Sequence, residues 1–265
     1  MDWWVFPLLF SIGVAVGVTN VLAGGGSLVS MPVLIFLGLD PAVANGTNRL
    51  AIAIQNIFAV TGFRRKGFGN IKFSLLLILP ALPGVIAGTI VAVKISGDIF
   101  RLILSIVMII MLPVILLRRK PQSRSDTEEF LDMRQRIMSM IFMAGIGFYS
   151  GFIQAGVGFL FIGAMVWTTT LNLVRVNAHK VFAIGVFTWI SVVIFAISGQ
   201  IQWTLALILS AGNALGGWLG SKAAVAGGEK WIKRVLTVAI ILMALKLMSK
   251  EIVVLLQAVL DYFRS

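Results

Sequence analysis

The sequence predicts an all-α polytopic membrane protein, and three observations carry this prediction. The 265-residue chain is 59% hydrophobic and has a mean hydropathy of +1.01. Only 12% of its residues are charged, about half the share that a soluble domain carries. Uncharged apolar runs of nearly twenty residues recur, as at 73–93 and 181–197. Runs of that length cross a bilayer as helices.

The first half of the chain divides into five apolar segments, each with a local reason for its start. Trp3 and Trp4 anchor a segment at 4–22 in the membrane interface, and three glycines precede a short one at 27–39. Asp40 and Pro41 are a helix N-cap and first position for a segment at 42–62. An uninterrupted apolar run follows at 73–93. The segment at 98–117 opens at Gly97.

The second half repeats this plan at a nearly constant offset along the chain. GNIKF at 69–73 matches GQIQW at 199–203, and GD at 97–98 matches GE at 228–229. NGTNR at 45–49 matches NAHK at 177–180 with one residue deleted, and the glycines at 24–26 fall near GVG at 156–158. The corresponding segments are predicted at 137–155, 158–170, 174–197, 203–224 and 230–248.

These segments predict two repeats with eight to ten membrane segments in total, some of them short or broken helices. The first repeat is predicted at 1–117, a polar cytoplasmic linker at 118–136, the second repeat at 137–250 and a tail at 251–265. The linker carries RRKPQSRSD and several carboxylates, a composition typical of a solvated segment.

The distribution of basic residues predicts that the two repeats are inverted. Basic residues lie between the third and fourth segments of the first half and between the fourth and fifth of the second, whereas the matching loops are almost uncharged. Cytoplasmic loops carry the excess of Lys and Arg. All basic loops reach the cytoplasm only if the halves are inverted, a frequent plan in secondary transporters. The alternative is a re-entrant second segment, with eight crossings and parallel halves.

Composition excludes several other function classes. The net charge is +12, but its pattern is that of membrane loops, so nucleic acid is not an expected partner. The chain has no cysteine, no HExxH motif and no Walker A motif. We therefore expect no cofactor, no metal and no enzymatic activity. The expected partners are the lipid bilayer and a small anionic substrate, and homodimerisation is left open.

The segment at 27–39 is too short to span the membrane. Its roughly thirteen residues rise about 20 Å, against a hydrocarbon core of about 30 Å. The break at Gly24, Gly25 and Gly26 would then lie inside the bilayer, where irregular backbone must line a cavity or be buried in protein. With Ser27, it would form an anion cradle at a helix N-terminus. The alternative is that these glycines permit close helix packing.

Two basic residues occupy corresponding places in the two repeats. Arg49 and Lys180 follow the starts of their helices by only a few residues, and no Asp or Glu lies in the middle of an apolar segment. We predict that the two cations share one bound anion, and that Arg49 reaches it if only one does. A structural Arg bonded to carbonyl groups is the alternative. The lone His179 is either a proton acceptor or a neutral hydrogen-bond donor.

The predicted substrate-binding set combines these positions with neighbouring polar residues. Gln55 and Asn213 are instead expected to join helices. The set is Asn20, Gly24, Gly25, Gly26, Ser27, Asn45, Thr47, Asn48, Arg49, Gln154, Asn177, His179 and Lys180.

The motifs also resemble a known family. GGGSLVSMP at 24–32, LGLDP at 37–41, NGTNR at 45–49, GFIQAGVGF at 151–159 and AGNALGGWLGSK at 211–222 are similar to the sulfite exporter TauE/SafE family. The resemblance implies a multi-pass permease of the bacterial inner membrane that moves sulfite or organosulfonates, with export favoured. The second glycine cluster reads GVGF and has no following proline, so the two cradles are not expected to be equivalent. An anion-binding membrane enzyme or assembly factor, or an anion channel, is the alternative.

Overall fold

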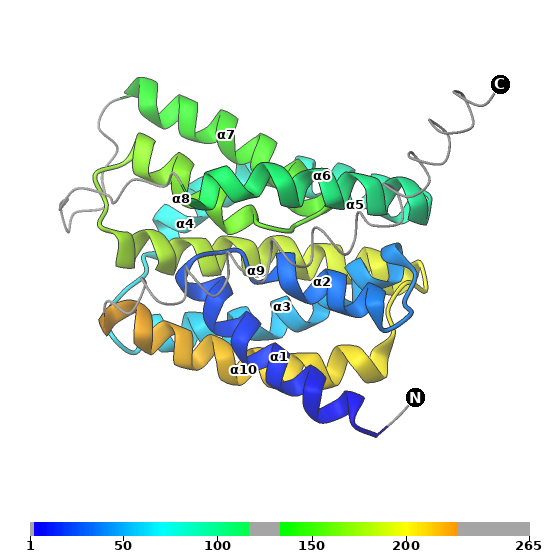
Figure 1. Ribbon diagram of the computed structural model, residues 1–265. Helices are drawn as coiled ribbons and strands as arrows, with labels where there is room; N and C mark the ends of the chain where they lie inside the picture. The colour runs from blue at the N-terminus through cyan, green and yellow to red at the C-terminus, as the bar shows by residue number, and fades with distance from the viewer. Residues whose placement is uncertain (1–2, 117–132, 227–265) are drawn as a thin grey trace.

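The computed structural model describes residues 3–116 and 133–226, and every regular element in these ranges is a helix. The segment predicted at 230–248, the tail and most of the linker lie outside the described residues. The helices, shown in Figure 1, are α1 (Val5–Leu22), α2 (Ser27–Phe36), α3 (Pro41–Arg64), α4 (Ile71–Ile78), η1 (Leu79–Ala81), α5 (Leu82–Lys94), α6 (Gly97–Leu116), α7 (Met133–Phe152), α8 (Val157–Thr168), α9 (Leu173–Ile197) and α10 (Trp203–Ala226).

Several helix starts have a side-chain cap. The Asp40 carboxylate accepts a hydrogen bond from the Ala42 amide, and the Asn172 side chain accepts one from the Arg175 amide. The predicted helix at 73–93 is interrupted by η1 around Pro80, which has no N–H to donate. The predicted linker ends at residue 136, but α7 already begins at Met133. The last four residues of the predicted linker are therefore helical.

Hydropathy agrees with a multi-pass membrane protein. Among the described residues, three helical stretches are long and apolar enough to cross a membrane: Val5–Leu22, Ile71–Lys94 and Leu173–Ile197. Two shorter apolar helices, α2 and α8, each follow a short non-helical interruption. Large apolar side chains are exposed on the outer surface of the bundle, among them Trp189, Ile197 and Leu207.

The main helix–helix contacts each have a counterpart in which both helices are replaced by their equivalents from the other repeat. Helix α1 packs on α10 as α7 packs on α5, and α3 packs on α10 as α9 packs on α5. The contacts of α2 with α1 and α3 likewise match those of α8 with α7 and α9, while α3 and α9 pack on each other at the centre. The packing of the described helices therefore follows the sequence repeat.

The matched helices run in opposite directions (Figure 1). The connection from α3 to α4, drawn in cyan, lies at the same end of the bundle as the orange end of α10. The yellow connection from α9 to α10 lies at the opposite end, with the start of α1. This arrangement is compatible with inverted repeats. Which end faces the cytoplasm stays a prediction.

Glycines bring the outer helices into backbone contact in both halves. A Cβ on Gly17 would lie 2.6 Å from the carbonyl oxygen of Asn213, and a Cβ on Gly147 would overlap the carbonyl oxygen of Ala81. Gly17 and Gly147 occupy the same position in the two repeats, and Ala81 and Asn213 nearly so. Small residues allow membrane helices to approach in this way, and here they bring α1 against α10 and α7 against η1.

Candidate functional site

Two buried helix breaks begin with the same pattern of backbone hydrogen bonds. Four residues separate α1 from α2, and four separate α7 from α8. The amides of Ala23 and Gly24 both donate to the Thr19 carbonyl. At the equivalent positions of the second repeat, the amides of Ile153 and Gln154 both donate to the Tyr149 carbonyl. The breaks are therefore structural equivalents.

Each break has a residue in the left-handed region of backbone space at its second position, and the second break has another at Gly156 (φ +73°). Gly24 has φ +86°, and Gln154 has φ +60°, the only positive φ of a non-glycine among the described residues. A Cβ on Gly24 would overlap the backbone of Gly158, and a Cβ on Gly158 would overlap that of Gly24. For Gly24, the structure thus gives a packing reason: the two breaks touch through bare backbone.

Lys180 on α9 fastens the end of α1. Its Nζ donates to the carbonyl oxygens of Asn20 (3.1 Å) and Val21 (2.7 Å) and to Oδ1 of Asn177 (2.7 Å). The last carbonyls of a helix have no partner within it and carry partial negative charge. Lys180 therefore supplies both the hydrogen bonds and the positive charge that this helix end needs.

Arg49 on α3 fastens the end of α7 in the same way. Its guanidinium donates to the carbonyl oxygens of Ser150 (2.9 Å), Gly151 (2.6 Å) and Phe152 (3.2 Å), and its Nε donates to Oδ1 of Asn45 (3.2 Å). The first two of these carbonyls are the repeat equivalents of the pair held by Lys180. Each half of the chain thus holds the broken helix of the other half through a buried cation.

A small cavity lies between the two breaks. Its volume is about 20 Å³, enough for one water molecule. Ser27 and Val157, the first residues of α2 and α8, both line it. The complete lining is Asn20, Gly24, Ser27, Ile52, Gln55, Asn56, Gln154, Val157, Lys180, Val181 and Ile184.

The polar groups around the cavity are only partly hydrogen-bonded to one another. Asn20 donates through Nδ2 to Oε1 of Gln55 (3.0 Å) and accepts at Oδ1 from the Ser27 amide (3.3 Å). Gln154 donates to Thr188, but its Oε1 has no partner among the described residues, and neither has Nδ2 of Asn56. Both side chains are at least 97% buried. Leaving a buried amide group without a hydrogen bond is costly. A ligand that bonded to these two groups would remove that cost.

The structure brings together five of the predicted site residues at this cavity: Asn20, Gly24, Ser27, Gln154 and Lys180. Arg49 is absent from the lining and Lys180 is present, which is the reverse of the expected preference. Gln55 joins helices through Asn20, as expected, but it also lines the cavity, as does Asn56. Neither was in the predicted set.

The remaining predicted residues lie outside the cavity lining. Gly25 and Gly26 lie in the first break, and Asn45 and Asn177 accept hydrogen bonds from the two buried cations. Thr47 accepts from the Gln202 amide and Asn48 from the Ser30 hydroxyl. The His179 ring contacts the Ser74 hydroxyl at 2.8 Å and the ring of Phe73.

Comparison with known proteins identifies the family. The family model described as "Sulfite exporter TauE/SafE" matches residues 9–247. The chain belongs to this family. The TauE/SafE chain is 26% identical to a probable membrane transporter protein, ORF9, of Sinorhizobium sp. over 250 residues, covering 92% of this chain and 93% of that one.

Two further relatives have similar coverage. A probable membrane transporter protein of Haemophilus influenzae is 27% identical over 251 residues, with 93% and 96% of the two chains covered. The probable membrane transporter protein YfcA of Escherichia coli K12 is 27% identical over 243 residues, with 91% and 88% covered. No solved structure matches the chain. The family and its relatives are transporters rather than enzymes, in agreement with the sequence prediction.

Proposed function

We propose that this protein is a secondary transporter of the bacterial inner membrane that exports small sulfur-containing anions, such as sulfite or organosulfonates. The observation that carries the proposal is the small polar cavity between two matched helix breaks, with Lys180 in its lining. The family description supports a sulfur oxyanion as substrate, and the bacterial relatives support the location.

The chemistry of the lining suits an oxyanion. Two helix N-termini, at Ser27 and Val157, face the cavity, and helix N-termini carry partial positive charge. Lys180 adds a full charge, and the Asn56 amide adds an unpaired donor. Discontinuous transporter helices present such ends to anionic substrate groups. Sulfite and sulfonate groups supply only acceptor oxygens, which match the positive charge of this lining and the unpaired Asn56 amide.

The cavity is smaller than the proposed substrates. A volume of about 20 Å³ holds a water molecule, whereas an anion with four or more heavy atoms needs the two breaks to move apart. Opening toward either end of the bundle in turn, by motion of one repeat against the other, gives alternating access. The chain has no nucleotide-binding motif, so the proposed transport is driven by gradients rather than by ATP.

Counterflow in proteoliposomes tests this function. Vesicles loaded with unlabelled sulfite, sulfate, thiosulfate, taurine, isethionate or sulfoacetate are diluted into the corresponding labelled anion. A carrier accumulates label transiently when its own substrate is inside. Label that only equilibrates passively indicates a channel. Binding without flux indicates an enzyme or assembly factor, and either result would contradict the proposal.

A pair of variants tests the position of the site. Asn56→Ala should lower the affinity for the transported anion about tenfold, because a hydrogen bond to a charged group is lost. Asn213→Ala is the matched control, since Asn213 is also a fully buried amide on a long helix but does not line the cavity. Equal effects of the two substitutions would remove the cavity from the proposal.

A further inference from the structure

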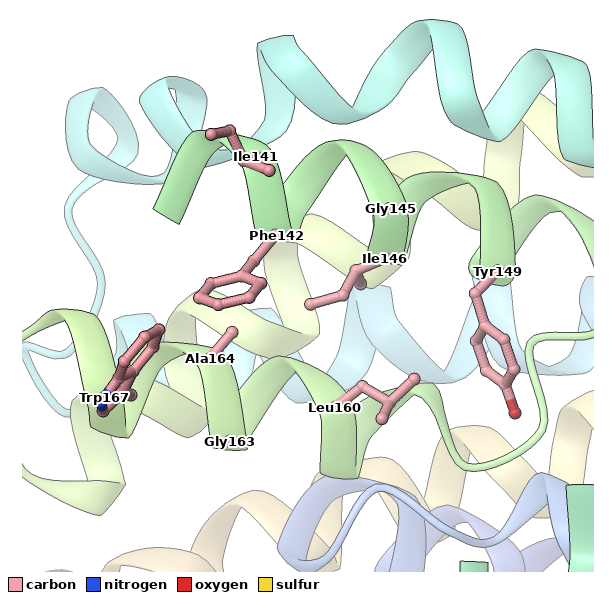
Figure 2. A pocket seen from close by; sticks show the side chains of 9 residues that line it. All are labelled: Ile141, Phe142, Gly145, Ile146, Tyr149, Leu160, Gly163, Ala164 and Trp167. Carbon is pink, nitrogen blue, oxygen red and sulfur yellow. The ribbon is translucent and has the colours of Figure 1, made fainter. Parts of the chain in front are cut away.

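A second hollow lies on the outer surface of the second repeat, between α7 and α8 (Figure 2). It is an open groove of about 510 Å³ with apolar walls, to which α7 contributes Phe142 and Tyr149 and α8 contributes Leu160 and Trp167. In Figure 2 these side chains point into the space between the two helices. The groove is separate from the central cavity.

Two glycines create the groove. At Gly145 and Gly163 an added Cβ would meet nothing within 4 Å, whereas on the same helix as Gly145 a Cβ at Gly147 would meet the backbone of η1 and one at Gly151 the backbone of α5. A glycine inside a helix costs about 1 kcal/mol relative to alanine. Contacts among the described residues give no packing reason for Gly145 and Gly163. Both glycines line the groove, and the absence of their side chains keeps it open.

One end of the groove carries a positive charge. A smaller hollow of about 230 Å³ is lined by Arg134, Met138 and Trp167, and it shares Trp167 with the groove. From Arg134 to Tyr149 the distance along α7 is about 22 Å, at 1.5 Å per residue. Half of a hydrocarbon core is about 15 Å. The combined hollow is therefore long enough to reach from the headgroups to the middle of a membrane.

We propose that this groove binds an anionic phospholipid of the cytoplasmic leaflet. Arg134 and Trp167 contact the headgroup phosphate, and one acyl chain lies across Gly145 and Gly163. The hollow matches such a lipid in charge and in length. The cation lies at the end proposed for the headgroup, and the apolar groove beyond it is about as long as one leaflet is deep. Basic pockets between membrane helices on the cytoplasmic side are suited to such lipids. The choice of leaflet rests on the orientation predicted from the basic loops.

The first repeat lacks the same features, although its helices correspond. At the equivalent positions of the first repeat, Trp4 stands in place of Arg134, Ala15 in place of Gly145 and Val33 in place of Gly163. The equivalent surface thus has neither the cation nor the two glycines. In the predicted orientation it faces the other leaflet, so the lipid site belongs to one side of the membrane.

The deep end of the groove touches the second helix break. The Tyr149 hydroxyl donates to the Ala155 carbonyl, and the adjacent Gln154 lines the central cavity. A lipid chain against the Tyr149 ring therefore contacts the side chain that fixes this break. The bound lipid supports the closed geometry of the break.

Lipid retention tests the charged end. The full-length protein is purified in equal amounts of phosphatidylglycerol and phosphatidylcholine, and its bound lipids are counted by native mass spectrometry. We expect the wild type to retain phosphatidylglycerol about tenfold over phosphatidylcholine, and Arg134→Gln to lose this preference. Arg136→Gln, an exposed cation two residues along the same helix that lines neither hollow, should keep it. Equal retention of both lipids by the wild type would overturn the proposal.

Filling the groove tests the apolar part. Gly145→Leu with Gly163→Leu should abolish labelling of peptides from 141–167 by phosphatidylglycerol with a photoreactive acyl chain, while Ala15→Leu, at the equivalent exposed position of α1, should not. A photoreactive amino acid at position 163 in the full chain identifies the occupant directly. Capture of lipid supports the proposal. A cross-link to residues beyond 226, or to a second copy of the chain, shows a protein occupant and overturns it.

Discussion

Arg49→Lys separates a structural role of this cation from a role in binding the substrate. The wild-type guanidinium is fully buried and donates to three carbonyl groups at the end of α7 and to Asn45. Lysine keeps the positive charge but offers a single ammonium in place of a planar fork with five donors. We therefore expect the substitution to weaken the attachment of α7 even though the net charge is unchanged.

The magnitude follows from the number of bonds lost. An ammonium at this position can replace at most about two of the four hydrogen bonds, and each bond to a charged group contributes about 1.5–3 kcal/mol. The expected loss of stability is thus about 3–6 kcal/mol. One kcal/mol shifts the midpoint of thermal unfolding by about 2–4 °C in a chain of this size. Arg49→Lys should lower the midpoint by at least about 6 °C.

Scanning fluorimetry in detergent measures this shift, and anion affinity is measured on the same preparation below the unfolding temperature. Arg101→Lys is the control. Arg101 forms an ion pair with Asp98 at 3.6 Å, and the Asp98 side chain is largely exposed. Such pairs contribute about 0–1 kcal/mol to stability. If Arg49→Lys left the midpoint unchanged and lowered anion affinity tenfold, the reasoning would be refuted, and Arg49 would act on the substrate.

Two other outcomes follow from the breaks and the basic loops. Gly24→Ala should destabilise the protein by about 1–3 kcal/mol more than Gly38→Ala, because both have positive φ but only Gly24 has another backbone where the Cβ would go; equal unfolding midpoints would contradict the packing role. In this cysteine-free chain, Lys66→Cys and Lys222→Cys should react with an impermeant maleimide from the cytoplasmic side and Ser198→Cys from the other, whereas labelling of positions 66 and 222 from opposite faces would sink the inverted arrangement.

Much of the helical framework could be predicted from the sequence because its signals are local. The apolar lengths and the cap at Asp40 gave helices within a few residues of those observed. The interruption at η1 was missed, although Pro80 was visible. Its effect depends on whether the neighbouring helices tolerate a local 3₁₀ turn, which a single segment does not reveal.

The candidate site was harder to predict because its partners come from the other repeat. By formal charge, Arg49 has no carboxylate partner in the apolar segments, which favours a shared anion. The partners are instead the terminal carbonyls of α7, whose partial charges belong to no residue type. Likewise, Asn45 and Asn56 lie near one face of α3 but about 16 Å apart along its axis. Asn45 therefore meets α7, whereas Asn56 meets the cavity.

The two cations occupy matched positions, but they do not hold their helices equally. Arg49 binds three carbonyls of α7 and does not line the cavity, whereas Lys180 binds two carbonyls of α1 and does. An anion in the proposed site competes with those two carbonyls for the same ammonium. It cannot compete in this way for Arg49. If an anion binds there, its charge weakens the bonds by which Lys180 holds the first break, whereas the bonds of Arg49 and of the Tyr149 hydroxyl at the second break are not affected. In the proposed mechanism, the two breaks therefore have unequal parts in transport.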